Sequence, residues 1–166
     1  MAQDSSMVDL QAKARAKLAA DPAFDSVPVL TESLKDVESE LLRALGPQTT
    51  GASGVVCIVI TPKFKVSSPN VPGPWFDKVR LVVRIMENVT VNQQPGGTGK
   101  PALMLVRAAA RVLHQYFEAG IFAPLSVLDA VLVPDHDAEN GAGGNLIYDL
   151  NLETSLNDLP GVNLAE

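Results

Sequence analysis

The sequence predicts a single-domain α+β protein, with a mainly antiparallel four-stranded sheet and helices packed on one face, in the order α-α-β-β-α-β-β. The chain has 166 residues, the usual length of one domain, so we expect residues 1–166 to share one core. Its hydrophobic fraction of 46% and charged fraction of 19% are those of a globular protein. Segments of helical periodicity and of strand alternation both occur, and the strands come in pairs, which favours an antiparallel sheet.

Three segments are predicted to be helices. Residues 8–20 are rich in Ala, Lys, Arg and Leu, which favour helix, and they end before an Asp-Pro pair. Residues 31–45 carry apolar side chains at three- and four-residue spacing, with Thr31 as the expected N-cap and a Gly-Pro pair at the end. Residues 101–119 have the same periodicity, begin with a proline and stop before a glycine.

Four segments are predicted to be strands. Residues 55–61 form a continuous β-branched run that is too short for a helix and is typical of a strand buried on both faces. In residues 77–89 apolar and basic side chains alternate, so we expect a long strand whose solvent-exposed, basic face carries Arg80 and Arg84. The last pair of strands is predicted at residues 125–133 and 146–154.

The segment 62–76 is too long and too rich in proline for a tight hairpin turn, so we expect it to project from the sheet. Trp75 and Phe76 form an adjacent aromatic pair at its end, and two interpretations stay open. The pair either tucks back over the sheet or anchors a partner surface. Residues 135–145 are predicted to be a polar loop, and residues 155–166 an extended arm.

Charge and composition narrow the classes of function. The net charge of −6 argues against a phosphate-neutralising surface, so any contact with DNA is expected to be passive. The single cysteine, Cys57, lies in an apolar run and has no partner for an internal disulfide, which fits a reducing compartment. No signal-peptide pattern opens the chain, and no apolar stretch approaches the roughly 20 residues that span a bilayer. We therefore expect a protein that is neither secreted by that route nor embedded in a membrane.

A glycine-rich turn at residues 95–101 is the candidate nucleotide site, because such turns can hold phosphate at a helix N-terminus. A P-loop requires a glycine where this chain has Gln94, and a Ser or Thr where it has Pro101. Pro101 also lacks one of the N–H donors that would face a phosphate. The sequence therefore predicts that this turn connects a strand to a helix, caps the start of the helix and binds no cofactor. A small nucleotide-binding enzyme using Gly96 to Lys100 is a less favoured alternative.

No metal site and no catalytic residue is predicted. Residues 135–141 place acidic groups two apart, as a calcium loop does, but the glycine falls one position late and Leu146 stands where a bidentate glutamate belongs. A zinc site has little support, because the chain has one cysteine and two histidines, His114 and His136. His114 has no obvious partner as a catalytic base, and no Gly-x-Ser-x-Gly elbow occurs. We therefore expect a protein that is not an enzyme.

The order and character of these segments resemble the tail terminator proteins of tailed bacteriophages, also called tail completion or minor tail proteins. The resemblance covers residues 27–154 and leaves out the N-terminal helix and linker at residues 1–26 and the C-terminal arm at residues 155–166. The stretches that carry it are Leu34-Lys35-Asp36-Val37-Glu38, Lys78-Val79-Arg80-Leu81-Val82-Val83-Arg84-Ile85 running into Glu87-Asn88, Gly96-Gly97-Thr98-Gly99, Leu113-His114-Gln115-Tyr116-Phe117 and Tyr148-Asp149-Leu150-Asn151-Leu152.

The resemblance implies a structural virion protein without catalytic residues. Members of such families are α+β subunits that close into rings, commonly hexamers, at the head-proximal end of the tail tube, where they stop its growth and meet the head connector. The implied partners are other copies of the chain, the tail tube protein and the head-tail connector protein, with DNA passing through the lumen. The implied location is the tail or neck of a virion assembled in the host cytoplasm. Another neck or tail component, such as a head-tail connector, is the alternative.

The ring is expected to form through the sheet, either by pairing of edge strands or by packing of exposed faces, because an open sheet leaves two edges unpaired. The expected interface residues are Trp75, Phe76, Arg80, Arg84 and Ile147. Ile147 is expected to stand as a lone apolar side chain on the polar face of its strand, where it is useful only in an interface. The alternative is that a helix covers that face and Ile147 belongs to the core.

Overall fold

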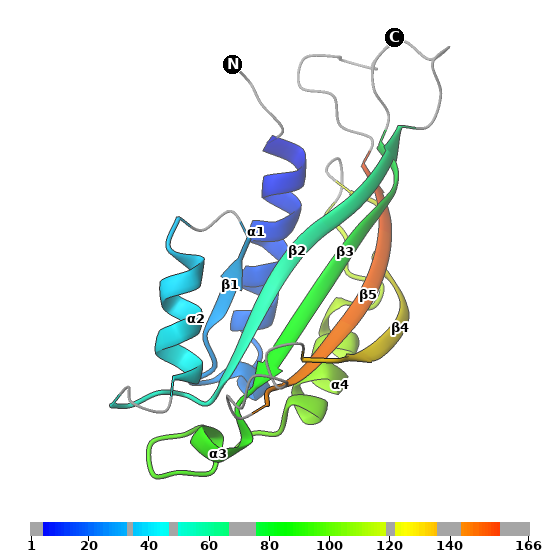
Figure 1. Cartoon of the computed structure of the whole chain (residues 1–166). Helices are drawn as coiled ribbons and strands as arrows, with labels where there is room; N and C mark the ends of the chain where they lie inside the picture. The colour runs from blue at the N-terminus through cyan, green and yellow to red at the C-terminus, as the bar shows by residue number, and fades with distance from the viewer. Residues whose placement is uncertain are drawn as a thin grey trace, which may run out of the picture.

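The computed structural model describes residues 5–32, 35–46, 50–66, 76–118, 122–135 and 144–156, and its strands form one mixed sheet (Figure 1). The α+β class predicted from the sequence is confirmed. The elements in chain order are α1 (Ser5–Ala19), η1 (Pro22–Phe24), β1 (Val29–Thr31), α2 (Val37–Leu45), β2 (Val55–Val66), β3 (Phe76–Glu87), α3 (Val89–Asn92), α4 (Ala102–Leu113), β4 (Ser126–Val133) and β5 (Leu146–Leu156).

The sheet has five strands in the order β1-β2-β3-β5-β4, so the prediction of four strands is wrong. The additional strand is β1, which runs parallel to β2, whereas every other neighbouring pair is antiparallel. Thr31, the expected N-cap of a helix, instead pairs with Val59 of β2, and the helix begins six residues later, at Val37. β1 has three residues, too few for an alternation of side chains to show in the sequence, so the pattern does not predict a strand there.

β2 and β3 form a hairpin that is longer than predicted. β2 continues through Pro62 to Val66 and pairs with β3 as far as Phe76. The register shifts between Ile60 and Lys63, and such an irregularity lets a proline lie within a strand because the ladder hydrogen bond is already lost there. The ends of the predicted projecting loop, residues 62–66 and residue 76, are therefore strand, and residues 67–75 lie outside the described residues.

Helices lie on both faces of the sheet, and the prediction of one covered face is therefore wrong. Alternate residues of β2 enter two separate cores: Cys57 packs with α1 and α4, whereas Val56 and Ile58 pack with α2. The larger core lies between the sheet and α1 with α4, which are behind the strands in Figure 1. The smaller core is the contact of α2 with β1 and β2, at one side of the opposite face.

The remaining elements follow the predictions with altered ends. The predicted helix 101–119 is α4, and it stops at His114 because Gln115 takes the left-handed conformation with φ 63°. The chain turns there, since the Gln115 N–H donates to the Leu125 carbonyl and the Leu125 N–H donates to the Tyr116 carbonyl. The helix predicted at 8–20 and the strands predicted at 125–133 and 146–154 are present as α1, β4 and β5.

Candidate assembly surface

The glycine-rich turn before α4 is closed by a buried carboxylate. Glu87 is 5% exposed, and its Oε2 accepts a hydrogen bond from the Ala102 N–H at 2.7 Å, in the first turn of α4. Its Oε1 accepts from Asn92 Nδ2 at 2.7 Å. The Oδ1 of Asn92 in turn accepts from Thr98 Oγ1 at 2.8 Å and from the Gly99 N–H at 2.9 Å. An internal anion thus takes the place at the helix N-terminus that a phosphate would need.

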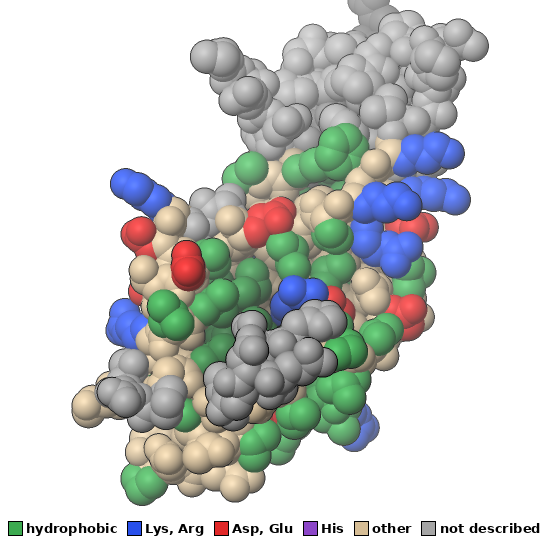
Figure 2. All heavy atoms as spheres, in the orientation of Figure 1, with side chains coloured by type: hydrophobic (Ala, Val, Ile, Leu, Met, Phe, Trp, Pro, Cys, Tyr) green, Lys and Arg blue, Asp and Glu red, His purple; other side chains and the backbone are tan. Residues whose placement is uncertain are grey.

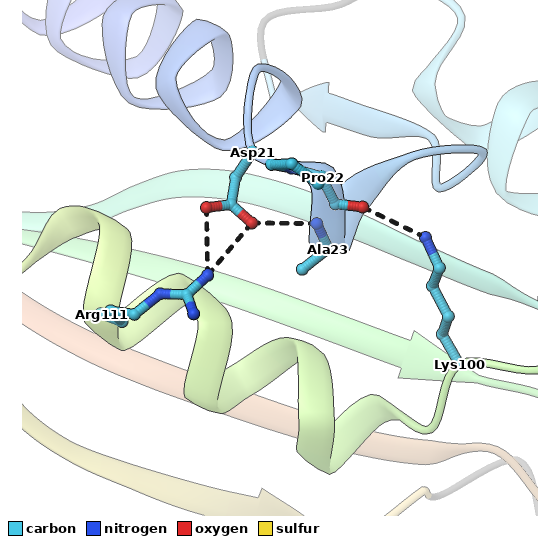
Figure 3. Close-up of polar contacts among 5 residues, drawn as sticks. All are labelled: Asp21, Pro22, Ala23, Lys100 and Arg111. Carbon is cyan, nitrogen blue, oxygen red and sulfur yellow. Dashed lines mark hydrogen bonds and ion pairs between the residues drawn. The ribbon is translucent and has the colours of Figure 1, made fainter.

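The cations beside this turn hold η1 against α4 (Figure 3). Lys100 Nζ donates to the carbonyl of Asp25 at 2.7 Å and lies 3.5 Å from the carbonyl of Pro22. Arg111 Nη2 pairs with Asp21 Oδ2 at 3.1 Å, and Asp21 Oδ1 also accepts from the Ala23 N–H at 2.9 Å. A groove of about 360 Å³ runs over the turn, but the lysine that lines it is bound to backbone carbonyls. The turn and its cations therefore hold residues 21–25 against α4.

The expected basic face of β3 is paired with acidic side chains of β5. Arg84 forms a fork with Asp149, in which Nε lies 2.8 Å from Oδ1 and Nη2 lies 2.7 Å from Oδ2. The hydrogen bond to Asp149 raises the pKa of the Arg84 guanidinium. Arg80 lies opposite Glu153, with a looser contact of 3.8 Å. Both arginines are half-buried, so this face carries neighbouring charges of both signs and is not a bare basic surface.

The other expected interface residues lie in different surroundings. Ile147 is only 8% exposed, so the expectation that it stands free on the face of β5 is wrong. It pairs with Met86 of β3 on one side and with Val133 of β4 on the other, and an inner position between two strands explains its burial. Phe76 is the first residue of β3, where its backbone pairs with Val66 and Leu156. Trp75 lies outside the described residues.

β4 carries the largest group of exposed apolar side chains on a strand. Leu128, Val131 and Leu132 are 47%, 47% and 54% exposed, on an edge strand of eight residues. Val131 lies opposite Asp149 and Leu132 opposite Tyr148, so successive side chains point to opposite faces and both faces are open. Figure 2 shows hydrophobic side chains gathered over the region of β4 and β5 at the lower right. The Val127 N–H of β4 donates a hydrogen bond to His114 Nδ1 at 3.4 Å.

The opposite edge of the sheet, formed by β1, is covered by α1. β1 has three residues, and α1 packs along it. The Nε of Arg15 on α1 donates to the Val29 carbonyl at 2.7 Å, which occupies a backbone acceptor on the side of β1 away from β2. Among the described residues the two edges therefore differ: β1 is short and covered by α1, whereas β4 is longer and largely apolar, with an exposed Asp129 and a register irregularity between Val127 and Asp129.

Sequence reasoning did not find the β4 surface. The strand Ser126–Val133 is apolar on both faces apart from Ser126 and Asp129, a pattern that is typical of a strand buried in the middle of a sheet. Only the strand order places it at an edge. The sequence signal that was available is the length of the apolar run without a proline or lysine, since those residues commonly protect edges.

The groups considered for catalysis or metal binding are scattered. In the part of the chain that the structure describes, no three side chains of the types His, Cys, Asp and Glu lie close enough to hold a metal ion. Asp135 Oδ2 accepts from the Asn145 N–H at 2.8 Å, and the rest of the considered calcium loop, residues 136–143, lies outside the described residues. Cys57 is fully buried, and burial raises the pKa of its thiol. No described helix is both long and apolar enough to cross a membrane.

No protein-family model matches the chain, and no curated protein matches it by sequence. A search of solved structures finds a chain from the "Virion of native gene transfer agent (GTA) particle". The two share 15% sequence identity and superpose with a TM-score of 0.57, and the alignment covers 92% of this chain and 97% of the other. At this identity the likeness shows a shared fold. The fold of the chain is thus one that also occurs in a chain of a gene transfer agent virion.

Proposed function

We propose that this chain is a structural subunit of a phage-type virion, and that it forms a ring which ends the tail tube and joins it to the head connector. The observation that carries the proposal is the nearly end-to-end likeness to a chain of a gene transfer agent virion, with 92% and 97% of the two chains aligned. The resemblance of residues 27–154 to tail terminators supports the same role.

The surfaces of the fold agree with an assembly role. The open edge of β4 and its exposed leucines and valine need a protein partner, because contiguous exposed apolar side chains mark interaction surfaces. The mixed charges of Arg80, Arg84, Asp149 and Glu153 give the adjoining face polar groups suited to the rim of such a contact. The net charge of −6 suits a ring through which DNA passes without being held.

The alternatives differ in what they require of the structure. A nucleotide-binding enzyme would use the turn before α4, where Glu87 already accepts the Ala102 N–H and Lys100 is bound to backbone carbonyls. A head-tail connector would share the fold and the location in the virion, and only the assembly phenotype separates it from a terminator. We therefore favour the terminator on the resemblance and keep the connector as the second candidate.

Deletion of the gene from a particle-producing strain tests the proposal. A terminator predicts tail tubes that exceed the normal length and heads that stay unjoined in electron micrographs, with both defects restored by the full-length chain. Tails of normal length that fail to join heads would favour the connector. Joined particles of normal shape would contradict both roles. In purified wild-type particles, quantitative mass spectrometry should give the copy number of a single hexameric ring.

A further inference from the structure

We propose that one end of the β2–β3 hairpin binds the phosphate backbone of duplex DNA through four cations, which we call the hairpin patch: Lys63 and Lys65 of β2, and Lys78 and Arg80 of β3. Figure 2 shows Lys and Arg side chains gathered at this end of the hairpin, at the upper right. The inference goes beyond the proposed function, which asks only that DNA pass through a ring. The contact needs no virion, so it can be tested separately from the ring.

The hairpin patch holds most of the cations that the fold leaves unpaired. Of the nine Lys and Arg residues outside the patch, seven contact a carboxylate, a carbonyl oxygen or an aromatic ring of the same chain. Within the patch, the side chains of Lys63, Lys65 and Lys78 make no such contact with a described residue, and Arg80 makes only the 3.8 Å contact with Glu153. The charges that remain available to an outside ligand are therefore concentrated at this end of the hairpin.

The arrangement of the patch is unfavourable in the free subunit. Lys63 lies directly opposite Arg80 in the register of β2 and β3, and like charges in such a pair repel each other. Lys78 has a φ of 52°, a left-handed conformation that is strained for lysine and that is found most often at functional sites. Phosphate groups bound between the cations would replace this repulsion with attraction.

A polar groove beside the patch can receive a phosphate group. Its volume is about 240 Å³, and its lining includes Lys78 and two residues with hydroxyl groups, Ser126 and Ser155. Ammonium and hydroxyl groups are common donors to phosphate oxygens in protein–DNA complexes. Two acidic residues, Glu153 and Asp77, adjoin the patch through their pairing with Arg80 and Lys65, so the four cations exceed the neighbouring acids by two.

The composition of the patch favours DNA over an acidic protein as the ligand. Three of its four cations are lysines, which are depleted at protein–protein interfaces. Exposed lysines bind DNA by displacing the counterions condensed on its phosphates. The net charge of −6 makes the rest of the surface repel DNA, so the contact is confined to the patch and should be weak and strongly dependent on salt.

The fluorescence anisotropy of a labelled duplex oligonucleotide, titrated with the full-length protein at several salt concentrations, tests the inference. For the wild type, the logarithm of the association constant should fall with the logarithm of the salt concentration with a slope of about −3 to −4, as four phosphate contacts predict. Lys63→Gln/Lys78→Gln should make that slope shallower by about 2 and weaken binding by about tenfold or more at low salt. Lys35→Gln/Arg107→Gln is the matched control, because it removes the same charge from two exposed cations outside the patch, and it should leave the slope unchanged.

Circular dichroism should show that both double variants stay folded, and the single variant Lys65→Gln, which should make the slope shallower by about 1, gives a second measurement. Poly-L-glutamate is the probe for an acidic protein ligand. The absence of DNA binding by the wild type at low salt, an equal loss of affinity in Lys35→Gln/Arg107→Gln, or binding of poly-L-glutamate as tight as that of DNA would each overturn the inference. None of these results would contradict the ring, which the tail length after gene deletion tests independently.

Discussion

Replacement of Glu87 by alanine tests whether the buried network before α4 holds the fold together. The carboxylate accepts two hydrogen bonds, from Ala102 N and Asn92 Nδ2, both at 2.7 Å. A hydrogen bond to a charged group contributes about 1.5–3 kcal/mol, and a buried donor left without a partner costs about 1–3 kcal/mol. Because Glu87 is 5% exposed, little water reaches the two donors after truncation. We therefore expect Glu87→Ala to lower the free energy of unfolding by about 3–5 kcal/mol.

Urea denaturation followed by far-UV circular dichroism measures this loss, with the slope of the free energy against urea as a check on two-state behaviour. Glu87→Gln keeps the shape and one acceptor but turns an N–H toward Asn92, so it should lose about 1–3 kcal/mol. Glu38→Ala, at an exposed glutamate of α2, is the control and should change stability by less than about 0.5 kcal/mol. A loss below about 1 kcal/mol for Glu87→Ala, with an unchanged slope, would refute the reasoning.

Three further predictions concern other parts of the fold. Arg84→Lys should lower stability by about 0.5–1 kcal/mol, because lysine cannot form the fork with Asp149, and a double-mutant cycle with Asp149→Asn should recover most of that coupling. Gly97→Ala should lower the free energy of unfolding, measured by urea denaturation, by about 2 kcal/mol or more, because its Cβ would lie 2.3 Å from a backbone oxygen of α3. Gly51→Ala is the comparison: its Cβ meets no atom within 4 Å, so only its φ of +77° should cost stability, by about 1–2 kcal/mol. Burial, and then the hydrogen bond to a neighbouring glutamate, raise the pKa of Tyr116 from 10.0 to about 12. The stability that this shift contributes is therefore present below pH 10 and is lost as the pH rises toward 12. Tyr116→Phe should reduce the fall in stability over this pH range, and an equal fall in the variant would contradict the assignment.

The parts of the fold that depend on local pattern were predictable from the sequence. The long alternation around Val83 identified a strand and its buried face, because the period of the side chains reflects the backbone directly. The three- and four-residue spacing in residues 101–119 identified a helix but not its buried face, since Leu103 is 54% exposed whereas Leu105 is fully buried. The parts that depend on tertiary pairing were not. The stripe of α2 shows that one side is buried, yet it does not say which face of the sheet buries it.

The candidate surface was harder to predict than the elements that form it. Ile147 and Val131 are both apolar residues of predicted strands, and only the strand order makes the first an inner residue and the second an edge residue. Arg84 was predicted to give a basic face, but its neutralisation depends on the register that sets Asp149 opposite it. Register is fixed by pairing partners distant in sequence, so no local pattern contains it.

The contact of Arg15 with the carbonyl of Val29 makes the sheet a monofunctional unit in the sense of polymer chemistry. A molecule with two reactive ends propagates a chain, whereas a molecule with one reactive end can only join once and stop. With β1 blocked and β4 free, strand pairing between these molecules ends after a single coupling step. Molecules of this kind can therefore be concentrated with an apolar strand exposed, because the cross-β growth that such a strand would otherwise propagate has no second end from which to continue.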